Sequence, residues 1–182
     1  MRSEIRLSGL CYLRWLRRFD RGTAYPEQIE AIAAEVRCEP LRGRTAMIID
    51  AMGVGDMGVD YARRLGLSPM PVKVIGEGRP HSEARYYYLP KRDMVQRISG
   101  TRAEKRLNLD LDHPLLPVLR KEVENFRIKF TNVGHDTYGA WRENEHDDLV
   151  FALGLACWWT QFATPAEMEA LGRQAAQGED GI

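Results

Sequence analysis

Three carboxylates in this chain are placed where they could bind a divalent cation. Asp50 ends an apolar run at residues 45–50, which we expect to be a strand covered on both faces, and a glycine loop follows it. Asp147 and Asp148 stand directly before a strongly apolar stretch at residues 149–159, which we expect to be helical. Carboxylates without a neighbouring Cys or His cluster suit hard cations such as magnesium or manganese. These aspartates are therefore our candidates for metal binding and catalysis.

Acidic residues at the start of a helix also have a purely structural explanation. With Asn144 as the N-cap, Asp147 falls in the first turn, where its charge meets the positive end of the helix dipole. Acids in this position are commonly capping residues. Successive helical residues point about 100° apart, so one of the two aspartates can cap the helix while the other binds a cation. Asp50 favours the metal site, because it adds a carboxylate from a separate element.

Composition excludes several classes of protein. A chain of 182 residues that is 44% hydrophobic can bury a core, and we expect one domain. The formal net charge is zero, so any surface for nucleic acid must be a local patch. The cysteines are odd in number and widely spaced, which argues against a disulfide framework and a zinc site. The charged N-terminal residues and the short apolar runs predict no signal peptide, no membrane span and a cytoplasmic protein.

Mixed strand and helix patterns predict an α/β fold. We expect strands at residues 10–19, 45–50, 71–75, 85–89 and 126–130, and helices beginning near Pro26, Asp60, Pro90, Leu115, Asp147 and Thr164. Alternation in the first strand places Trp15 on its buried side and Arg14 on the opposite side. Trp158 and Trp159 follow Leu155 at helical spacing, which indicates the core. Residues 1–163 form the predicted domain, and residues 164–182 a short helix and a tail.

The glycine loop allows a second interpretation. Gly53, Gly55 and Gly58 form a literal G-x-G-x-x-G between an expected strand and an expected helix, and Glu77 stands about where a ribose-binding acid belongs. Against a dinucleotide site, the charge of Asp50 would face the pyrophosphate, and a strand and a helix precede this unit. A tight turn that needs glycine is the structural explanation.

Four segments, RFDRGTAYP (residues 18–26), IIDAMGVG (48–55), LPKRD (89–93) and WRENEHDDLV (141–150), carry a resemblance to a known family. Together they resemble the nuclease domain of the large terminase subunit of tailed bacteriophages, which has a ribonuclease H-like fold. The resemblance covers roughly residues 10–160, and the last segment is its most specific part.

The resemblance implies a phage or prophage DNA-packaging enzyme in the cytoplasm of a bacterial host. Its chemistry would be the cleavage of double-stranded DNA by two Mg²⁺ or Mn²⁺ ions, one held by Asp50 and the other by Asp147 and Asp148. The implied partners are DNA, the terminase small subunit and the portal, with no membrane. The candidates for contact with DNA are Lys91, Arg92, Arg142 and His146.

One departure from the family pattern bears on activity. Family members begin with a central strand that carries a metal-binding aspartate, whereas Glu4 is the sole acid before residue 10 here. The expected fold is therefore a ribonuclease H-like mixed sheet that lacks this first strand and leaves a strand edge unpaired. A catalytically inactive, prophage-derived remnant or interaction module is the alternative that follows from this departure.

Overall fold

The computed structural model describes residues 10–109, 112–132 and 147–162. The chain divides into two compact units, each considered by itself below. Unit 1 comprises Met1–Arg18 and Arg92–Gln161, and unit 2 comprises Phe19–Lys91 and Phe162–Ile182. Helices and a mixed sheet make up the described residues, which confirms the α/β class.

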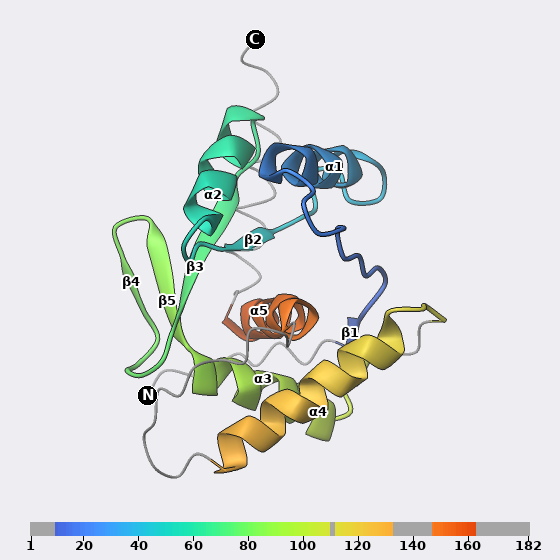
Figure 1. Ribbon diagram of the computed structural model, residues 1–182, viewed down its shortest axis with the longest axis vertical. Helices are drawn as coiled ribbons and strands as arrows, with labels where there is room; N and C mark the ends of the chain where they lie inside the picture. The colour runs from blue at the N-terminus through green and yellow to red at the C-terminus, as the bar shows by residue number, and fades with distance from the viewer. Residues whose placement is uncertain (1–9, 110–111, 133–146, 163–182) are drawn as a thin grey trace. The chain divides into compact units, whose positions relative to one another are not determined.

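The described part of unit 2 is a four-stranded sheet with two helices. Its elements are α1 (Tyr25–Arg37), β2 (Met47–Asp50), α2 (Gly55–Arg64), β3 (Pro69–Ile75), β4 (His81–Glu83) and β5 (Tyr86–Pro90) (Figure 1). The strand order is β2-β3-β5-β4, in which β2, β3 and β5 are parallel and β4 is antiparallel to β5. Among the described residues β2 pairs with β3 alone, so it forms one edge of this sheet.

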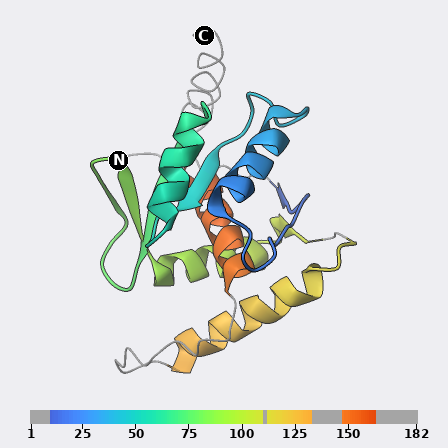
Figure 2. The same ribbon diagram turned by 45° about the horizontal axis from the view of Figure 1, so that its top comes forward.

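The core of unit 2 follows from the apolar runs of its strands. Val72 of β3 and Leu89 of β5 are fully buried, as expected of parallel strands covered on both faces. α2 packs on β2 and β3 and contacts α1, and both views show the two helices side by side (Figure 2). Val59 and Ala62 of α2 are fully buried, and Ile29 of α1 is buried on the same side of the unit.

The turn between β2 and α2 is held by an unusually close backbone approach. A Cβ added at Gly55 would lie 1.9 Å from the backbone oxygen of Asp50, so no side chain fits there. Gly53 has a φ of +55°, a conformation that glycine adopts at little cost. The sequence predicts the tight turn correctly, but α2 begins at Gly55 rather than at Asp60. Glycines propagate helices poorly, and this concealed the first turn of α2.

The residues of unit 1 that the structure describes form three helices and a two-stranded parallel sheet. Its elements are β1 (Cys11–Tyr12), α3 (Lys91–Ala103, whose first residue is assigned to unit 2), β6 (Leu107–Asn108), α4 (Leu116–Asn132) and α5 (Asp148–Phe162) (Figure 1). α5 approaches α3 so closely that a Cβ on Gly154 would lie 2.4 Å from the Cγ of Met94. On the α4 side, the rings of Phe126 and Phe151 pack edge to face with centroids 5.6 Å apart.

The apolar residues of α5 lie in the core, as their spacing predicts. Trp158 and Trp159 are both buried, which confirms their expected core position. Within the described residues, no helix combines the length and the apolar character needed to cross a membrane.

Two strand predictions in unit 1 are wrong. Residues 126–130 continue α4, although their alternation suggested a strand. Leu119, Val123 and Phe126 are buried at helical spacing, and the residues between them are good helix formers, so the 3.6-residue period prevails.

The strand expected at residues 10–19 is reduced to Cys11–Tyr12. Its partner β6 is equally short, so the ladder ends where β6 ends. Trp15, expected on the buried side, is 53% exposed, while Leu16 is buried instead. β4 was not predicted, because its His-Ser-Glu sequence lacks an apolar pattern. The helix expected at Thr164 lies outside the described residues.

Replacing Gly55 with alanine should destabilise the chain by about 3 kcal/mol, because the new methyl group overlaps the carbonyl oxygen of Asp50. Gly58→Ala is the matched control in the same helix. There, an added Cβ meets only Ile29 at an ordinary 3.7 Å, so alanine should be neutral or stabilising by up to about 1 kcal/mol. Chemical denaturation of both variants measures the difference, and equal stabilities would contradict the close approach.

Candidate metal centre

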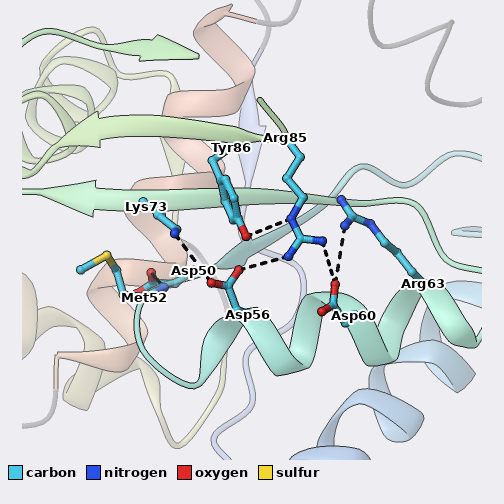
Figure 3. A network of polar contacts seen from close by, with 8 residues as sticks. All are labelled: Asp50, Met52, Asp56, Asp60, Arg63, Lys73, Arg85 and Tyr86. Carbon is cyan, nitrogen blue, oxygen red and sulfur yellow. Dashed lines mark hydrogen bonds and ion pairs between the residues drawn. The ribbon is translucent and has the colours of Figure 1, made fainter. Parts of the chain in front are cut away.

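Asp50 occupies the carboxyl end of β2, as the sequence predicts, and begins the turn into α2 (Figure 3). The backbone amide of Met52 donates to its Oδ1 at 3.0 Å, which fixes the side chain at the mouth of the turn. Burial raises the pKa of the Asp50 carboxyl above its ordinary value, and the hydrogen bond from Met52 lowers it in part. A bound cation would favour the ionised form, so this half-buried carboxylate is suited to a positively charged ligand.

The acids of α2 beside Asp50 are neutralised by cations of their own unit. Figure 3 shows Asp56 facing Lys73 of β3 and Arg85, at 3.7 and 3.9 Å respectively. Arg85 also contacts Asp60 at 2.9 Å. Among the described residues, Asp50 takes part in none of these ion pairs. Asp50 is therefore the better candidate for an external cation than Asp56 or Asp60.

Tyr86 organises the cationic side of this network. The Nζ of Lys73 lies 4.0 Å from the centroid of the Tyr86 ring, and Arg85 donates from Nε to the Tyr86 hydroxyl at 2.9 Å (Figure 3). The ring face and the hydroxyl thus each hold one cation next to the acids of α2. These contacts account for Lys73 and Arg85 as structural residues of unit 2.

Asp147 and Asp148 meet at the start of α5. The described helix begins at Asp148, and the carbonyl of Asp147 accepts from the amide of Phe151 at 3.0 Å. Asp147 is therefore the N-cap residue of the described helix. The sequence predicted Asn144 as the N-cap and Asp147 in the first turn, but Asn144 lies outside the described residues. The side chain of Asp148 is 72% exposed, with the Nε of Arg18 4.0 Å from its Oδ2.

A third carboxylate, Glu122 of α4, caps α5 from the side. Its Oε2 accepts from the backbone amides of Leu149 and Val150, each at 3.1 Å, and its Oε1 accepts from the Nη2 of Arg18. Glu122 is only 7% exposed, so these partners replace the water that a carboxylate would otherwise require. We call this arrangement the Glu122 clamp, and it joins residue 18, α4 and the start of α5.

The clamp changes the interpretation of the two aspartates. An N-cap side chain ordinarily accepts hydrogen bonds from the amides of the second and third helical residues. In α5 these residues are Leu149 and Val150, and both amides donate to Glu122. Glu122 therefore supplies an acceptor for these donors from a separate helix. This weakens the capping explanation, which was the main alternative to metal binding.

Sequence analysis missed Glu122, although a signal was present. Glu122 lies on the same helical face as Leu119, Val123 and Phe126, at the spacing of an apolar stripe. A carboxylate inside such a stripe is buried when the helix packs, and a buried carboxylate needs partners. This pattern could have predicted that Glu122 is a buried structural residue. It could not have predicted which donors bind Glu122.

The remaining predicted residues are only partly described. Lys91 and Arg92 are the first two residues of α3, and Arg92 is exposed. Arg142 and His146 lie outside the described residues. The glycine loop does lead into a helix flanked by parallel strands, yet Asp56 adds a second negative charge to the first turn of α2.

The structure brings Asp147 and Asp148 together in unit 1 and places Asp50 in unit 2. The described residues contain no group of three or more His, Cys, Asp and Glu side chains that could hold a metal ion together. A metal site shared by the three aspartates therefore stays a prediction. Comparisons of this chain with protein-family models, with curated proteins and with solved structures found no match.

Replacing Glu122 with alanine should lower the free energy of unfolding by about 3 kcal/mol, because two buried amides and Arg18 lose their acceptor. Glu122→Gln keeps one acceptor oxygen and should cost less. Glu124→Ala, an exposed position on the same helix, is the control and should change stability by less than about 0.5 kcal/mol. Denaturation curves that do not separate Glu122→Ala from Glu124→Ala would refute the clamp.

Proposed function

We propose that this chain is the nuclease domain of a phage or prophage terminase large subunit, which cleaves double-stranded DNA with two Mg²⁺ or Mn²⁺ ions. In this mechanism two cations about 3.5–4 Å apart align an attacking water and the leaving oxygen across one phosphate. Asp50 would hold one cation, and Asp147 and Asp148 the other. The proposal rests on the resemblance of four sequence segments and on the local geometry of the aspartates.

The observation that carries the proposal is the Glu122 clamp. Two adjacent acids at a helix start are ordinarily explained as caps, but the clamp supplies the acceptor for the amides of Leu149 and Val150. It also fixes the first turn of α5 in unit 1, so that Asp147 and Asp148 extend from a rigid element. Preorganised ligands of this kind favour metal binding, because less conformational entropy is lost when the ion binds.

The local geometry of Asp50 supports the same function. Parallel α/β sheets commonly bind ligands beyond the carboxyl ends of their strands, and Asp50 is the last residue of β2. The contact between its carbonyl and Gly55 fixes the backbone from which the carboxylate projects. Burial raises the pKa of Asp50, and a bound cation would offset the cost of holding this carboxylate ionised where water is partly excluded.

A ribonuclease H-like fold is the finer part of this proposal. In that fold the first strand pairs with the strand that carries the second aspartate, which corresponds to β2 here. The described sheet leaves that edge of β2 open, which is compatible with the proposed fold. The parallel β2-α2-β3 unit also agrees with it.

Lys91 and Arg92 remain candidates for phosphate contact. They open α3, at the positive end of its dipole, where a cation gains nothing from the helix. Because Arg92 does not stabilise its own helix there, we propose that it contacts a phosphate of DNA. Arg142 and His146 are proposed to contact DNA as well. The proposed partners are double-stranded DNA, the terminase small subunit and the portal.

Two alternatives make different predictions. An inactive remnant would keep the fold without cleaving DNA. A dinucleotide-binding protein would use Gly53, Gly55 and Gly58, but the carboxylates of Asp50 and Asp56 would both repel a pyrophosphate at that loop. The parallel β2-α2-β3 unit is the structural feature of the described residues that favours this second alternative, beside the motif itself.

Incubation of the chain with supercoiled plasmid in Mn²⁺ or Mg²⁺ tests the proposed function. We expect cleavage to be weak in Mg²⁺ and stronger in Mn²⁺, because Mn²⁺ binds carboxylate sites more tightly. Asp50→Asn and Asp147→Asn should each reduce cleavage by at least about 100-fold, since each removes a charged ligand. Asp60→Asn, which alters an ion-paired acid of α2, should leave cleavage unchanged.

The result also separates the alternatives. Folded protein that neither binds Mn²⁺ by calorimetry nor cleaves DNA would support the inactive remnant. Cleavage that Asp50→Asn does not affect would show that the proposed site is wrong. Saturable binding of NAD at micromolar concentration would favour the dinucleotide alternative.

A further inference from the structure

Residues 10–17 of unit 1 expose an unusual set of side chains. Leu10 is 62% exposed, Tyr12 48% and Trp15 53%. Large apolar side chains that are exposed one by one need no explanation, but three within six residues form a patch. The patch was not expected from the sequence, since alternation placed Trp15 on the buried side.

Arginines are interleaved with these aromatic residues. The guanidinium of Arg14 lies over the ring of Tyr12, with its Cζ 4.8 Å from the centroid, and the exposed Arg17 follows Trp15. No acidic residue occurs between residues 10 and 19. The neighbouring Arg18 is excluded from the patch, because the Glu122 clamp holds it.

The strand pairing brings further positive charge beside this segment. β1 pairs with β6, and the amide of Cys11 donates to the carbonyl of Arg106 at 2.7 Å. Residues 106–108 therefore lie next to residues 11–13, and the exposed Lys105 directly precedes them in the chain. Glu104, the acid that precedes Lys105, is paired with Arg106 at 3.0 Å. A chain of zero net charge thus carries a local cationic surface here.

Unit 2 offers a contrasting pair of the same residue types. The guanidinium of Arg64 lies over the ring of Tyr61 at 5.7 Å, but the Tyr61 hydroxyl donates to Glu30. That pair joins α2 to α1 and stands next to an acid, so it has a structural function. Within the described residues Arg14 contacts the ring of Tyr12 and pairs with no acid.

We propose that Tyr12, Arg14, Trp15 and Arg17, the aromatic–arginine strip, bind a single strand of nucleic acid with unpaired bases. The rings of Tyr12 and Trp15 would stack on successive bases, while Arg14 and Arg17 contact phosphates. Aromatic side chains interleaved with cations are the features by which proteins bind single strands without sequence preference. A duplex keeps its bases stacked, so it would use the cations but not the rings.

This inference is independent of the metal site. It concerns unit 1 alone and needs neither Asp50 nor a divalent cation. Binding can therefore be measured in EDTA, where any metal-dependent cleavage is absent, so the outcome does not depend on the proposed nuclease function.

The test is fluorescence anisotropy of labelled oligo-dT of about 15 nucleotides, titrated with the full chain in EDTA at low salt. Trp15→Ala should weaken binding by about 5- to 150-fold, the range expected for the loss of one stacked base. Arg14→Gln should weaken binding and reduce the slope of log affinity against log salt by about 0.7. Both side chains are exposed, and circular dichroism of each variant verifies that it folds.

Arg64→Gln is the matched control, because it removes an arginine from the equivalent pair in unit 2 and should leave oligo-dT binding unchanged. Oligo-dT binding that is equal in wild type, Trp15→Ala and Arg14→Gln would overturn the proposal. So would a duplex of the same length that competes as well as oligo-dT. Self-association that Trp15→Ala abolishes, without any oligo-dT binding, would identify the strip as a protein interface instead.

Discussion

The geometry of unit 1 depends on one buried carboxylate. Glu122 is desolvated by the packing of α4, and it can be accommodated only where donors face it. The first amides of α5 and the guanidinium of Arg18 supply those donors, so the position of each is tied to the others. Removing any one leaves a buried polar group unsatisfied. The start of α5, and with it Asp147 and Asp148, is therefore specified by a residue on another helix.

In unit 2 the start of α2 beside Asp50 is fixed by steric contact instead of by a buried carboxylate. Gly55 lets α2 begin against the carbonyl of Asp50, and the ion pairs of Asp56 with Lys73 and Arg85 hold that helix on the sheet. In each unit a candidate metal ligand lies at the end of a strand or helix. The backbone there is held mainly by contacts of other residues rather than by the carboxylate of the candidate ligand. Such an arrangement suits a site that receives a cation.

The sequence predicts those elements whose pattern and packing agree. The apolar runs of β2 and β3 are strands as predicted, and the position of Asp50 follows from the first of them. β3 is largely buried, whereas β2 at the sheet edge is only half-buried. Prediction fails where local alternation competes with tertiary packing, as at Phe126, which belongs to the helical stripe of α4. It also fails at Trp15, because the length of a strand depends on a partner that the local pattern does not reveal. Glu122 is recognisable as an anomaly in the sequence, but its donors come from distant residues.

The central proposal is that Asp50 holds one metal ion and that Asp147 and Asp148 hold a second ion beside it. A crystal structure of the chain grown in Mn²⁺, with the ions located by anomalous scattering, tests it most directly. The account predicts Mn²⁺ bound between Asp50 and the start of α5, with the carboxyl carbons of Asp50 and Asp147 about 4–8 Å apart. Manganese bound elsewhere, or Asp50 and Asp147 on opposite faces of the sheet, would contradict it.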